Sequence, residues 1–431
     1  MGFFKFLSLF LFLVLFSVNL NAVVLSVNET NILHANDAQV DDIFGSRSSM
    51  DGSYFVIAAF NEDGGSGDPL LNSGAVYVYE HNSSNSSDWD EISILRASDA
   101  QTNDYFGTSV SINGLYVVVG AEGEDGGSGD PLSASGAVYV YERNSSNSSD
   151  WDEISILRAS DAQASDYFGN TVNIDGDYVV VGAILEDGGL GDPLSNSGAV
   201  YIYERNSSNS SDWDEISILR ASDARASDNF GRSVSISGSY LVVGANGEDG
   251  GPGDPLSGSG AVYIYERNSS NSSDWNEISI LHASDAQAND NFGNIVDLDD
   301  SYLVIGAYLE DGGLGDPLSN SGAVYIYERN SSNSSDWNEI SILRASDAQV
   351  SDAFGRTVSI SGSYFVIGAD QEDGGSGDPL SDSGAVYTFN ILEEITVLSN
   401  SFSSLFPVFG LFSFVMFLGI LVFGFGFSKK K

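Results

Sequence analysis

The sequence has no cysteine, only three histidines, and no lysine outside its two apolar ends. Without cysteine the chain cannot form a disulfide, a thiolate zinc site or a thiol nucleophile, and three histidines leave little room for a histidine-rich metal site. Positive charge is scarce, because 61 aspartates and glutamates stand against 16 lysines and arginines, for a net charge of −45. A chain this acidic repels nucleic acid, which excludes nucleic-acid binding by its main body.

Long apolar runs occur only near the two ends. Residues 1–22 contain one charge, Lys5, then a Phe/Leu-rich run and a polar stretch ending at Ala22. This layout predicts a secretory signal peptide cleaved after Ala22; a first transmembrane helix is the alternative, for which the run is short. Residues 405–427 carry no charge and are long enough to cross a bilayer core of about 30 Å as a helix.

A basic tail, residues 428–431, follows this second apolar segment, and its three lysines belong on the cytosolic side of a membrane. We therefore predict a transmembrane helix at 405–427 after a linker at 391–404. The protein is then a single-pass membrane protein of the cell surface with an extracellular N-terminal region. A lipid-anchor signal is the alternative, although such tails do not usually end in three lysines.

Between the two ends, one unit of 62 residues is copied six times with no helical periodicity. A fixed period of this size predicts a propeller, a solenoid or an array. The copies are nearly identical even in their loops, which indicates recent duplication, so identity between copies is weak evidence that a residue matters. The Phe-Gly pairs that mark the period begin at Phe44, Phe106, Phe168, Phe230, Phe292 and Phe354.

Each unit contains four short apolar runs separated by turn sequences. From Phe106 these read FGTSVSI, YVVVGA, GAVYVYER and EISILRAS, with a tight turn at Asn113-Gly114 and a polar hairpin NSSNSSDWD. Asn-Gly between β-branched runs is a strong hairpin signal, and alternation of Val and Tyr has the period of a strand. The unit is therefore predicted to be four antiparallel strands in a meander, the content of one propeller blade.

The phase of the repeats predicts a closed ring. The segment Asn31–Ala35 reads NILHA, one period before SILRA, while the last unit stops after its third strand at Phe389. The N-terminal strand can complete the last blade and remove two open sheet edges. Residues 30–390 are thus predicted to form an all-β, six-bladed propeller of four-stranded antiparallel blades, closed by the N-terminal strand.

The series Phe-Gly-x-Ser-Val-Ser-Ile, a turn, Val-Val-Val-Gly-Ala and Gly-Ala-Val-Tyr-Val-Tyr resembles the FG-GAP repeat of the integrin alpha-chain β-propeller and its microbial relatives. The resemblance implies an extracellular propeller that binds ligands, often with calcium. Integrin propellers have seven blades, and their calcium loops lie between the first and second strands, where this chain has only a tight turn such as Asp175–Asp177. That calcium site is therefore not carried over. The proline of the family's GAP triplet is also absent, since Glu122 follows Gly120-Ala121.

The acidic loops are the best candidate for a metal site. Each loop between the second and third strands reads Glu-Asp-Gly-Gly-x-Gly-Asp-Pro, and each loop between the fourth and first strands adds two aspartates on the same predicted face. Calcium takes oxygen ligands from carboxylates and carbonyls of flexible loops. The predicted calcium ligands are Glu62, Asp63, Asp68, Glu124, Asp125, Asp130, Glu186, Asp187, Asp192, Glu248, Asp249, Asp254, Glu310, Asp311, Asp316, Glu372, Asp373 and Asp378.

Two other interpretations of these loops stay open. Asp, Gly and Pro are ordinary turn formers, so the carboxylates can instead cap turns through backbone N–H groups. The loop also reads GGxGD, one residue short of the calcium nonapeptide GGxGxD. Alternatively, the acidic surface is itself an adaptation to high salt.

The polar hairpins carry Asn-x-Ser sequons, which are exposed glycan acceptors in a secreted chain of a host that has the machinery. In a prokaryotic host they are simply polar hairpins multiplied by duplication. The predicted glycosylation sites are Asn28, Asn82, Asn85, Asn144, Asn147, Asn206, Asn209, Asn268, Asn271, Asn330 and Asn333.

No Ser-His-Asp or Cys-His set can be assembled, and none of the many carboxylate pairs is singled out for glycoside hydrolysis. The protein is therefore expected not to be an enzyme. We predict a membrane-anchored extracellular propeller for cell-surface adhesion or binding of a protein or glycan ligand, with calcium as a candidate cofactor. A structural surface-coat protein with a salt-adapted acidic surface and an extracellular polysaccharide-acting enzyme are the alternatives.

Overall fold

The computed structural model describes residues 32–390, except 66, 68, 85–87, 128, 130, 190, 192, 252–254, 314–316 and 374–381. Every regular element in these residues is a β-strand. The strands are β1 (Arg47–Asp51), β2 (Tyr54–Ala59), β3 (Ala75–His81), β4 (Trp89–Leu95), β5 (Phe106–Asn113), β6 (Tyr116–Ala121), β7 (Ala137–Arg143), β8 (Trp151–Leu157), β9 (Phe168–Asp175), β10 (Tyr178–Ala183), β11 (Ala199–Arg205), β12 (Trp213–Leu219), β13 (Phe230–Ser237), β14 (Tyr240–Ala245), β15 (Ala261–Arg267), β16 (Trp275–Leu281), β17 (Ile295–Asp299), β18 (Tyr302–Ala307), β19 (Ala323–Arg329), β20 (Trp337–Leu343), β21 (Thr357–Ser361), β22 (Tyr364–Ala369) and β23 (Ala385–Asn390).

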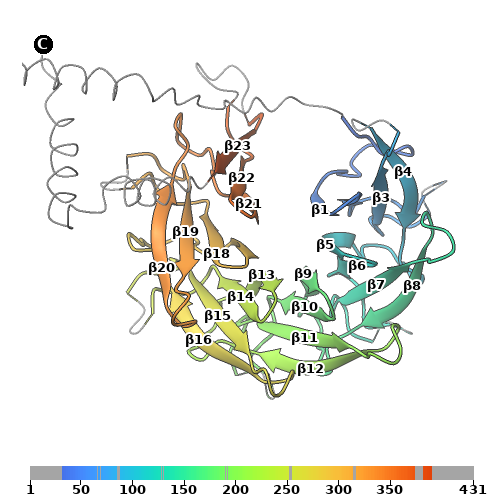
Figure 1. The fold of residues 1–431 in the computed structure, drawn as a ribbon, viewed down its shortest axis with the longest axis horizontal. Coiled ribbons are helices and arrows are strands. Elements are labelled where there is room, and N and C mark those ends of the chain that lie inside the picture. The colour runs from blue at the N-terminus through green and yellow to red at the C-terminus, as the bar shows by residue number, and fades with distance from the viewer. Residues whose placement is uncertain are drawn as a thin grey trace, which may run out of the picture.

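The strands form six antiparallel sheets in chain order, β1–β4, β5–β8, β9–β12, β13–β16, β17–β20 and β21–β23. Each sheet is a meander whose first strand lies on the inner side of the arc of blades and whose last strand lies at the periphery (Figure 1). We number these sheets as blades 1 to 6. The prediction of a six-bladed all-β propeller with four-stranded antiparallel blades is confirmed, except that the described part of blade 6 has three strands.

Apolar side chains between successive blades form the core. The face of blade 2 that meets blade 3 presents Val118, Val138 and Val140, and these pack with Phe168 and Tyr201 of blade 3. The ring of Phe168 meets that of Tyr201 edge to face at 5.3 Å. We call the side that meets the next blade along the chain the forward face and the opposite side the receiving face. Since both faces of each inner blade are covered, the second strand reads as the continuous apolar run YVVVGA.

The inner strands are joined across blades by side chains that accept backbone hydrogen bonds. An inner strand is the edge of its own sheet, so some of its N–H groups have no strand partner. The N–H of Ile236 in β13 donates to Oδ1 of Asn173 at 3.0 Å, and that of Ile360 in β21 donates to Oδ2 of Asp297 at 2.9 Å. Serines occupy this position in the other blades, as where Ile112 donates to Ser49 Oγ at 3.2 Å.

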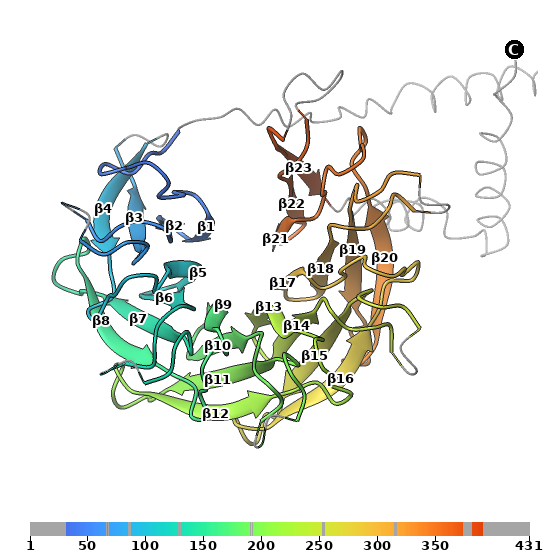
Figure 2. The same cartoon turned by 180° about the vertical axis from the view of Figure 1, so that it is seen from behind.

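The predicted closure by the N-terminal strand is wrong for this structure, in which the blades form an arc that is open between β1 and β21 (Figures 1 and 2). Residues 32–35 form no strand, and Leu33 and Ala35 pack on the receiving face of blade 1. These apolar contacts are available to NILHA without blade 6, whereas pairing with β23 requires blade 6 to dock against blade 1. The forward face of blade 6 accordingly stays open, with Val366 46% and Val386 69% exposed. Asn31 lies outside the described residues.

The described residues contain no helix that is long and apolar enough to cross a membrane. The predicted signal peptide, linker, transmembrane helix and basic tail all lie outside those residues.

Candidate functional site

Two kinds of loop meet on one face of the propeller, as predicted from the alternation of strand direction. The backbone N–H of Asn103, in the loop between β4 and β5, donates to the carbonyl of Leu71, in the loop between β2 and β3, at 2.8 Å. Phe106 N–H likewise donates to Ser73 O at 3.0 Å. We call this side the loop face; the polar hairpins lie at the opposite ends of the strands.

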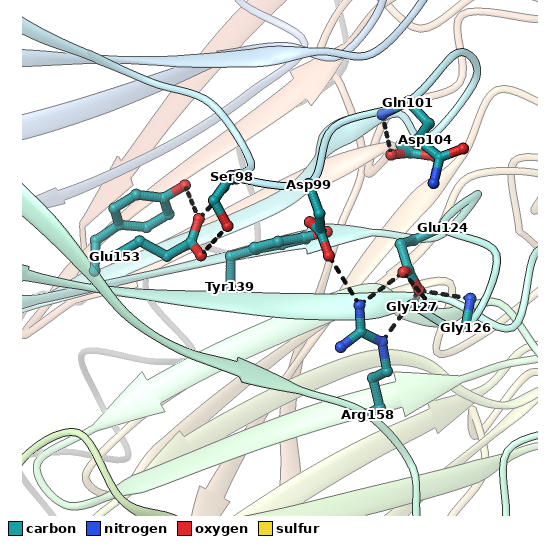
Figure 3. Close-up of polar contacts among 11 residues, drawn as sticks. Ser98, Asp99, Gln101, Asp104, Glu124, Gly126, Gly127, Tyr139, Glu153 and Arg158 are labelled. Carbon is teal, nitrogen blue, oxygen red and sulfur yellow. Dashed lines mark hydrogen bonds and ion pairs between the residues drawn. The ribbon is translucent and has the colours of Figure 1, made fainter. Parts of the chain in front are cut away.

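The glutamate of each Glu-Asp-Gly-Gly motif is buried inside its own loop. Glu124 is 4% exposed, and its carboxylate accepts the N–H groups of Gly126 at 2.9 Å and Gly127 at 2.7 Å. Both glycines have positive φ, near +88° and +84°, which glycine adopts without strain. A third partner is Arg158, whose Nη2 lies 2.7 Å from the same carboxylate (Figure 3). Glu124 therefore organises the loop around an internal ion pair.

The same arginine ties two successive blades together. Arg158 Nη2 also lies 3.2 Å from Oδ2 of Asp99, which comes from the loop that leaves blade 1. Oδ1 of Asp99 accepts the hydroxyl of Tyr139 at 2.7 Å (Figure 3). Burial, together with this hydrogen bond to Asp99, raises the pKa of Tyr139, so its hydroxyl stays protonated and donating. We call the set Asp99, Glu124, Tyr139 and Arg158, and its copies, the latch.

The second aspartate of each loop between blades is also used for folding. Asp104 is 3% exposed, and its Oδ2 accepts the N–H of Gln101 at 2.6 Å. Burial raises the pKa of Asp104 to about 6, although the hydrogen bond from Gln101 acts in the opposite direction. The aspartate therefore caps a turn rather than presenting a free carboxylate on the surface.

The described carboxylates do not fit a calcium site at the glutamates. Four of the six glutamates have a guanidinium within 2.7 Å, whose positive charge opposes a bound cation, and the carboxylate oxygens already accept backbone N–H groups. The aspartate that follows each glutamate caps the loop, as Asp125 Oδ1 does by accepting Ala134 N–H at 2.8 Å. No group of three or more Asp, Glu or His in the described residues could hold a metal ion.

The remaining predicted calcium ligands have not been placed. The third carboxylate of each loop lies outside the described residues, so calcium at these positions stays a prediction. They are Asp68, Asp130, Asp192, Asp254, Asp316 and Asp378.

Replacing Glu124 with glutamine should destabilise the protein by roughly 2–4 kcal/mol, because it leaves the Arg158 guanidinium without its nearest carboxylate. Glu248→Gln is the matched control. Glu248 accepts the same two glycine N–H groups, but His282 replaces the arginine and its Nδ1 lies 3.6 Å away. Thermal and urea unfolding should show the smaller loss for Glu248→Gln. Equal losses would show that the arginine adds nothing beyond the loop hydrogen bonds.

The sequons lie on the hairpins, opposite the loop face. The second asparagine of each fully described pair, such as Asn147, is exposed, whereas the first is half-buried, and Asn144 Nδ2 donates to Asp152 at 3.0 Å. Asn28 and Asn85 lie outside the described residues. Glycosylation stays a prediction.

The centre of the loop face differs from one blade to the next, in contrast to the nearly identical latches. At the position after the second strand the six copies carry six different residue types, while the adjoining Glu-Asp-Gly-Gly is the same in all six. We call three positions per blade the channel mouth: the residue after the second strand, and the residues before and after Phe-Gly. They are Phe60, Glu122, Ile184, Asn246, Tyr308 and Asp370; Ile43, Tyr105, Tyr167, Asn229, Asn291 and Ala353; and Ser46, Thr108, Asn170, Arg232, Asn294 and Arg356.

Mouth residues of neighbouring blades contact one another. Arg232 Nε donates to Asn294 Oδ1 at 3.2 Å, and Arg356 lies 4.3 Å from the ring centre of Tyr308. Between blades 1 and 2, the rings of Phe60 and Tyr105 are 6.4 Å apart. The mouth thus brings together aromatic, amide, acidic and cationic side chains along the arc.

Motifs defined by shared residues do not reveal the channel mouth, because no residue type recurs there often enough. The signal in the sequence is the opposite one, namely variation at a few positions within copies that are otherwise nearly identical. Six different side chains at one position cannot all serve the same packing role, so the fold does not dictate their identity.

A model of the FG-GAP repeat matches six stretches that cover most of the chain. They are residues 27–79, 89–141, 151–203, 213–265, 275–327 and 337–389. The chain belongs to the FG-GAP repeat family. Each match starts at an outer strand, or its N-terminal equivalent, and ends with the third strand of the following blade. No curated protein matches this FG-GAP chain.

Among solved structures, this FG-GAP propeller is similar to the periplasmic gluconolactonase PpgL of Pseudomonas aeruginosa. The TM-score is 0.50 and the identity 12%, and the similarity covers 80% of this chain and 82% of that chain. A likeness at this identity shows the fold alone. It does correct the expectation that the protein is not an enzyme, since a similar propeller is one and the fold therefore gives no ground for excluding catalysis.

Proposed function

We propose that this FG-GAP protein is an extracellular, membrane-anchored propeller that recognises a ligand at the cell surface through its channel mouth. The observation that carries the proposal is the position after the second strand, where six nearly identical blades present Phe60, Glu122, Ile184, Asn246, Tyr308 and Asp370. Varied side chains held on one face of a rigid scaffold are a common arrangement of a binding site.

The latches support a separation between the residues that hold the blades together and the residues that bind a ligand. They use the shared glutamates, arginines, aspartates and tyrosines to hold successive blades together, which leaves the mouth residues free for a ligand. The last strand, β23, runs from the loop face toward the hairpin side. A membrane anchor after it would therefore leave the loop face directed outward.

The proposal predicts that mouth residues can be exchanged between blades at the expense of binding but not of stability. Phe60→Asn and Tyr308→Asn, which copy Asn246, should leave thermal unfolding nearly unchanged, because another blade already folds with asparagine there. Each should weaken a ligand found on an array of glycans and small metabolites by about tenfold, or ~1.4 kcal/mol. Asn147→Ser on the exposed hairpin is the control. If Asn147→Ser abolishes binding and the mouth variants do not, the binding site lies on the hairpin side and not at the mouth.

Catalysis on a sugar lactone is a second candidate function, suggested by the gluconolactonase likeness and by an acid in the mouth. Glu122 accepts a hydrogen bond from Asn170 Nδ2 and remains partly exposed, so it could serve as a base. Hydrolysis of gluconolactone that is lost in Glu122→Gln would favour the enzyme. Hydrolysis no faster than in buffer would exclude this substrate.

A further inference from the structure

We propose that the channel mouth binds a small organic carboxylate, holding the carboxylate with Arg232 and Arg356 and the rest of the molecule against Phe60 and Tyr105. This inference rests on the proposed function and names the chemical class of the ligand. Three observations carry it: the pairing of the arginines in the propeller, the geometry of the two guanidinium groups, and the uneven distribution of side chains around the mouth.

The arginines of the latches are closely paired with carboxylates, whereas Arg232 and Arg356 of the mouth are not. Arg96, Arg158, Arg220 and Arg344 each contact a glutamate and an aspartate of a latch. By contrast, no described carboxylate lies within 4 Å of Arg232 or Arg47, and Arg356 reaches Asp370 only at 3.9 Å. Arg143 and Arg267, at the hairpin ends of the third strands, likewise have no described carboxylate within 4 Å, and they stack on the rings of Tyr54 and Tyr178.

The charges of Arg47, Arg232 and Arg356 affect one another. Burial lowers the pKa of Arg232, and the nearby charge of Arg356 lowers it further. Burial also lowers the pKa of Arg47, with added effects from Arg232 and Arg356. The arginines of blades 1, 4 and 6 thus repel one another, the carboxylate of Glu122 offsets part of that repulsion, and a bound anion would offset more of it.

Both guanidinium groups are held in place while keeping donors free. Arg232 is fixed through Nε by Asn294, and its two terminal nitrogens have no partner among the residues described. Arg356 stacks on the ring of Tyr308. A planar guanidinium with two free N–H groups matches the two oxygens of a carboxylate, and its fixed orientation lowers the entropy lost on binding.

The two sides of the mouth differ in character. Blades 1 to 3 contribute the apolar and aromatic residues Ile43, Phe60, Tyr105, Tyr167 and Ile184, together with Ser46, Thr108, Glu122 and Asn170. Blades 4 to 6 contribute Asn229, Arg232, Asn246, Asn291, Asn294 and Arg356, together with Tyr308, Ala353 and Asp370. A ligand that spans the mouth therefore meets both mouth arginines and most of the amides on one side, and most of the aromatic and aliphatic side chains on the other. The net charge of −45 disfavours a polyanion, whereas a single carboxylate meets less repulsion.

The experiment uses the full chain in detergent and two pairs of probes, phenylacetate with phenylacetamide and glucuronate with glucose. Ligand-observed NMR and calorimetry should show saturable binding of at least one carboxylate and none of its neutral partner. Arg232→Asn and Arg356→Asn, which copy residues of other blades, should each weaken that binding about tenfold. Arg225→Gln, on the exposed loop between blades 3 and 4, removes the same charge, copies the glutamine of the other blades and should have no effect.

The outcomes separate this inference from the proposed function. Failure of both carboxylates at millimolar concentration, or equal binding of a carboxylate and its neutral partner, would overturn the inference. If binding of a ligand depends on Tyr308 but not on the two arginines, the mouth remains the binding site, and the inference that the ligand is a carboxylate is overturned. A ligand that depends on no mouth residue would overturn both.

Discussion

Gly169→Ala is expected to lower the free energy of unfolding by roughly 3 kcal/mol or more, because it combines strained backbone with overpacking. Gly169 has φ near +89°, which an alanine adopts only with strain. A Cβ there would lie 2.6 Å from the carbonyl oxygen of Ala137 in the preceding blade, closer than real Cβ contacts. The backbone itself would have to move, since the obstacle is a carbonyl and not the end of a flexible side chain.

Gly176→Ala is the matched control for this prediction. Gly176 also has positive φ, near +59°, but a Cβ there would have nothing within 4 Å. Gly176→Ala should therefore lower the free energy of unfolding only by the cost of the backbone strain, roughly 1–2 kcal/mol. Thermal unfolding followed by circular dichroism measures both variants. Similar losses in the two would mean that the close approach of the blades contributes nothing.

The second large effect concerns Asp297, whose replacement by asparagine should stabilise the protein above pH 6. Burial raises the pKa of Asp297 to about 6, despite hydrogen bonds that favour its charged form. The ionised carboxylate is therefore disfavoured in the folded state. Asn173 shows that asparagine fits, since it accepts the N–H of Ile236 as Asp297 accepts that of Ile360.

The pH dependence follows from the direction of this shift. The contribution of Asp297 to stability is complete below its unfolded pKa, near 4, and is lost as the pH rises through about 6. Asp297→Asn should therefore gain about 2 kcal/mol at pH 8 and nothing at pH 4, allowing for some contact with solvent in the channel. The reciprocal change, Asn173→Asp, should lose stability at pH 8. Urea unfolding at both pH values tests the pair, and a gain that does not depend on pH would contradict the assignment.

Much of the fold could be predicted from the sequence because local patterns and the repeat agree. The apolar run YVVVGA, the Asn113-Gly114 turn and the 62-residue period each point to a meander of four strands. Gly169 shows why glycine follows phenylalanine in the repeat, because the backbones of successive blades approach closely there. Closure was not predictable in the same way, because Leu33 and Ala35 can pack on blade 1 whether or not β23 comes alongside.

The candidate site was less accessible to sequence reasoning. The pattern Glu-Asp-Gly-Gly shows that the loop contains carboxylates. It does not show that Arg158, which directly follows the outer strand β8, contacts Glu124. A cation from the chain itself thus occupies the place that the loop composition suggested for calcium. At the mouth, residues such as Arg232 look like scattered differences between copies until the fold brings them to one rim.

The latch has a consequence for how the gene can change length. Asp99 lies in one unit, and its partners Glu124, Tyr139 and Arg158 lie in the next, so no unit carries a latch that functions alone. Recombination that adds or removes a whole unit of 62 residues restores every latch at the new junction. A gain or loss of part of a unit that removes Asp99 or Arg158 without its partner leaves that latch incomplete. Inheritance in whole units therefore preserves the scaffold, while each new unit brings mouth residues that are free to diverge.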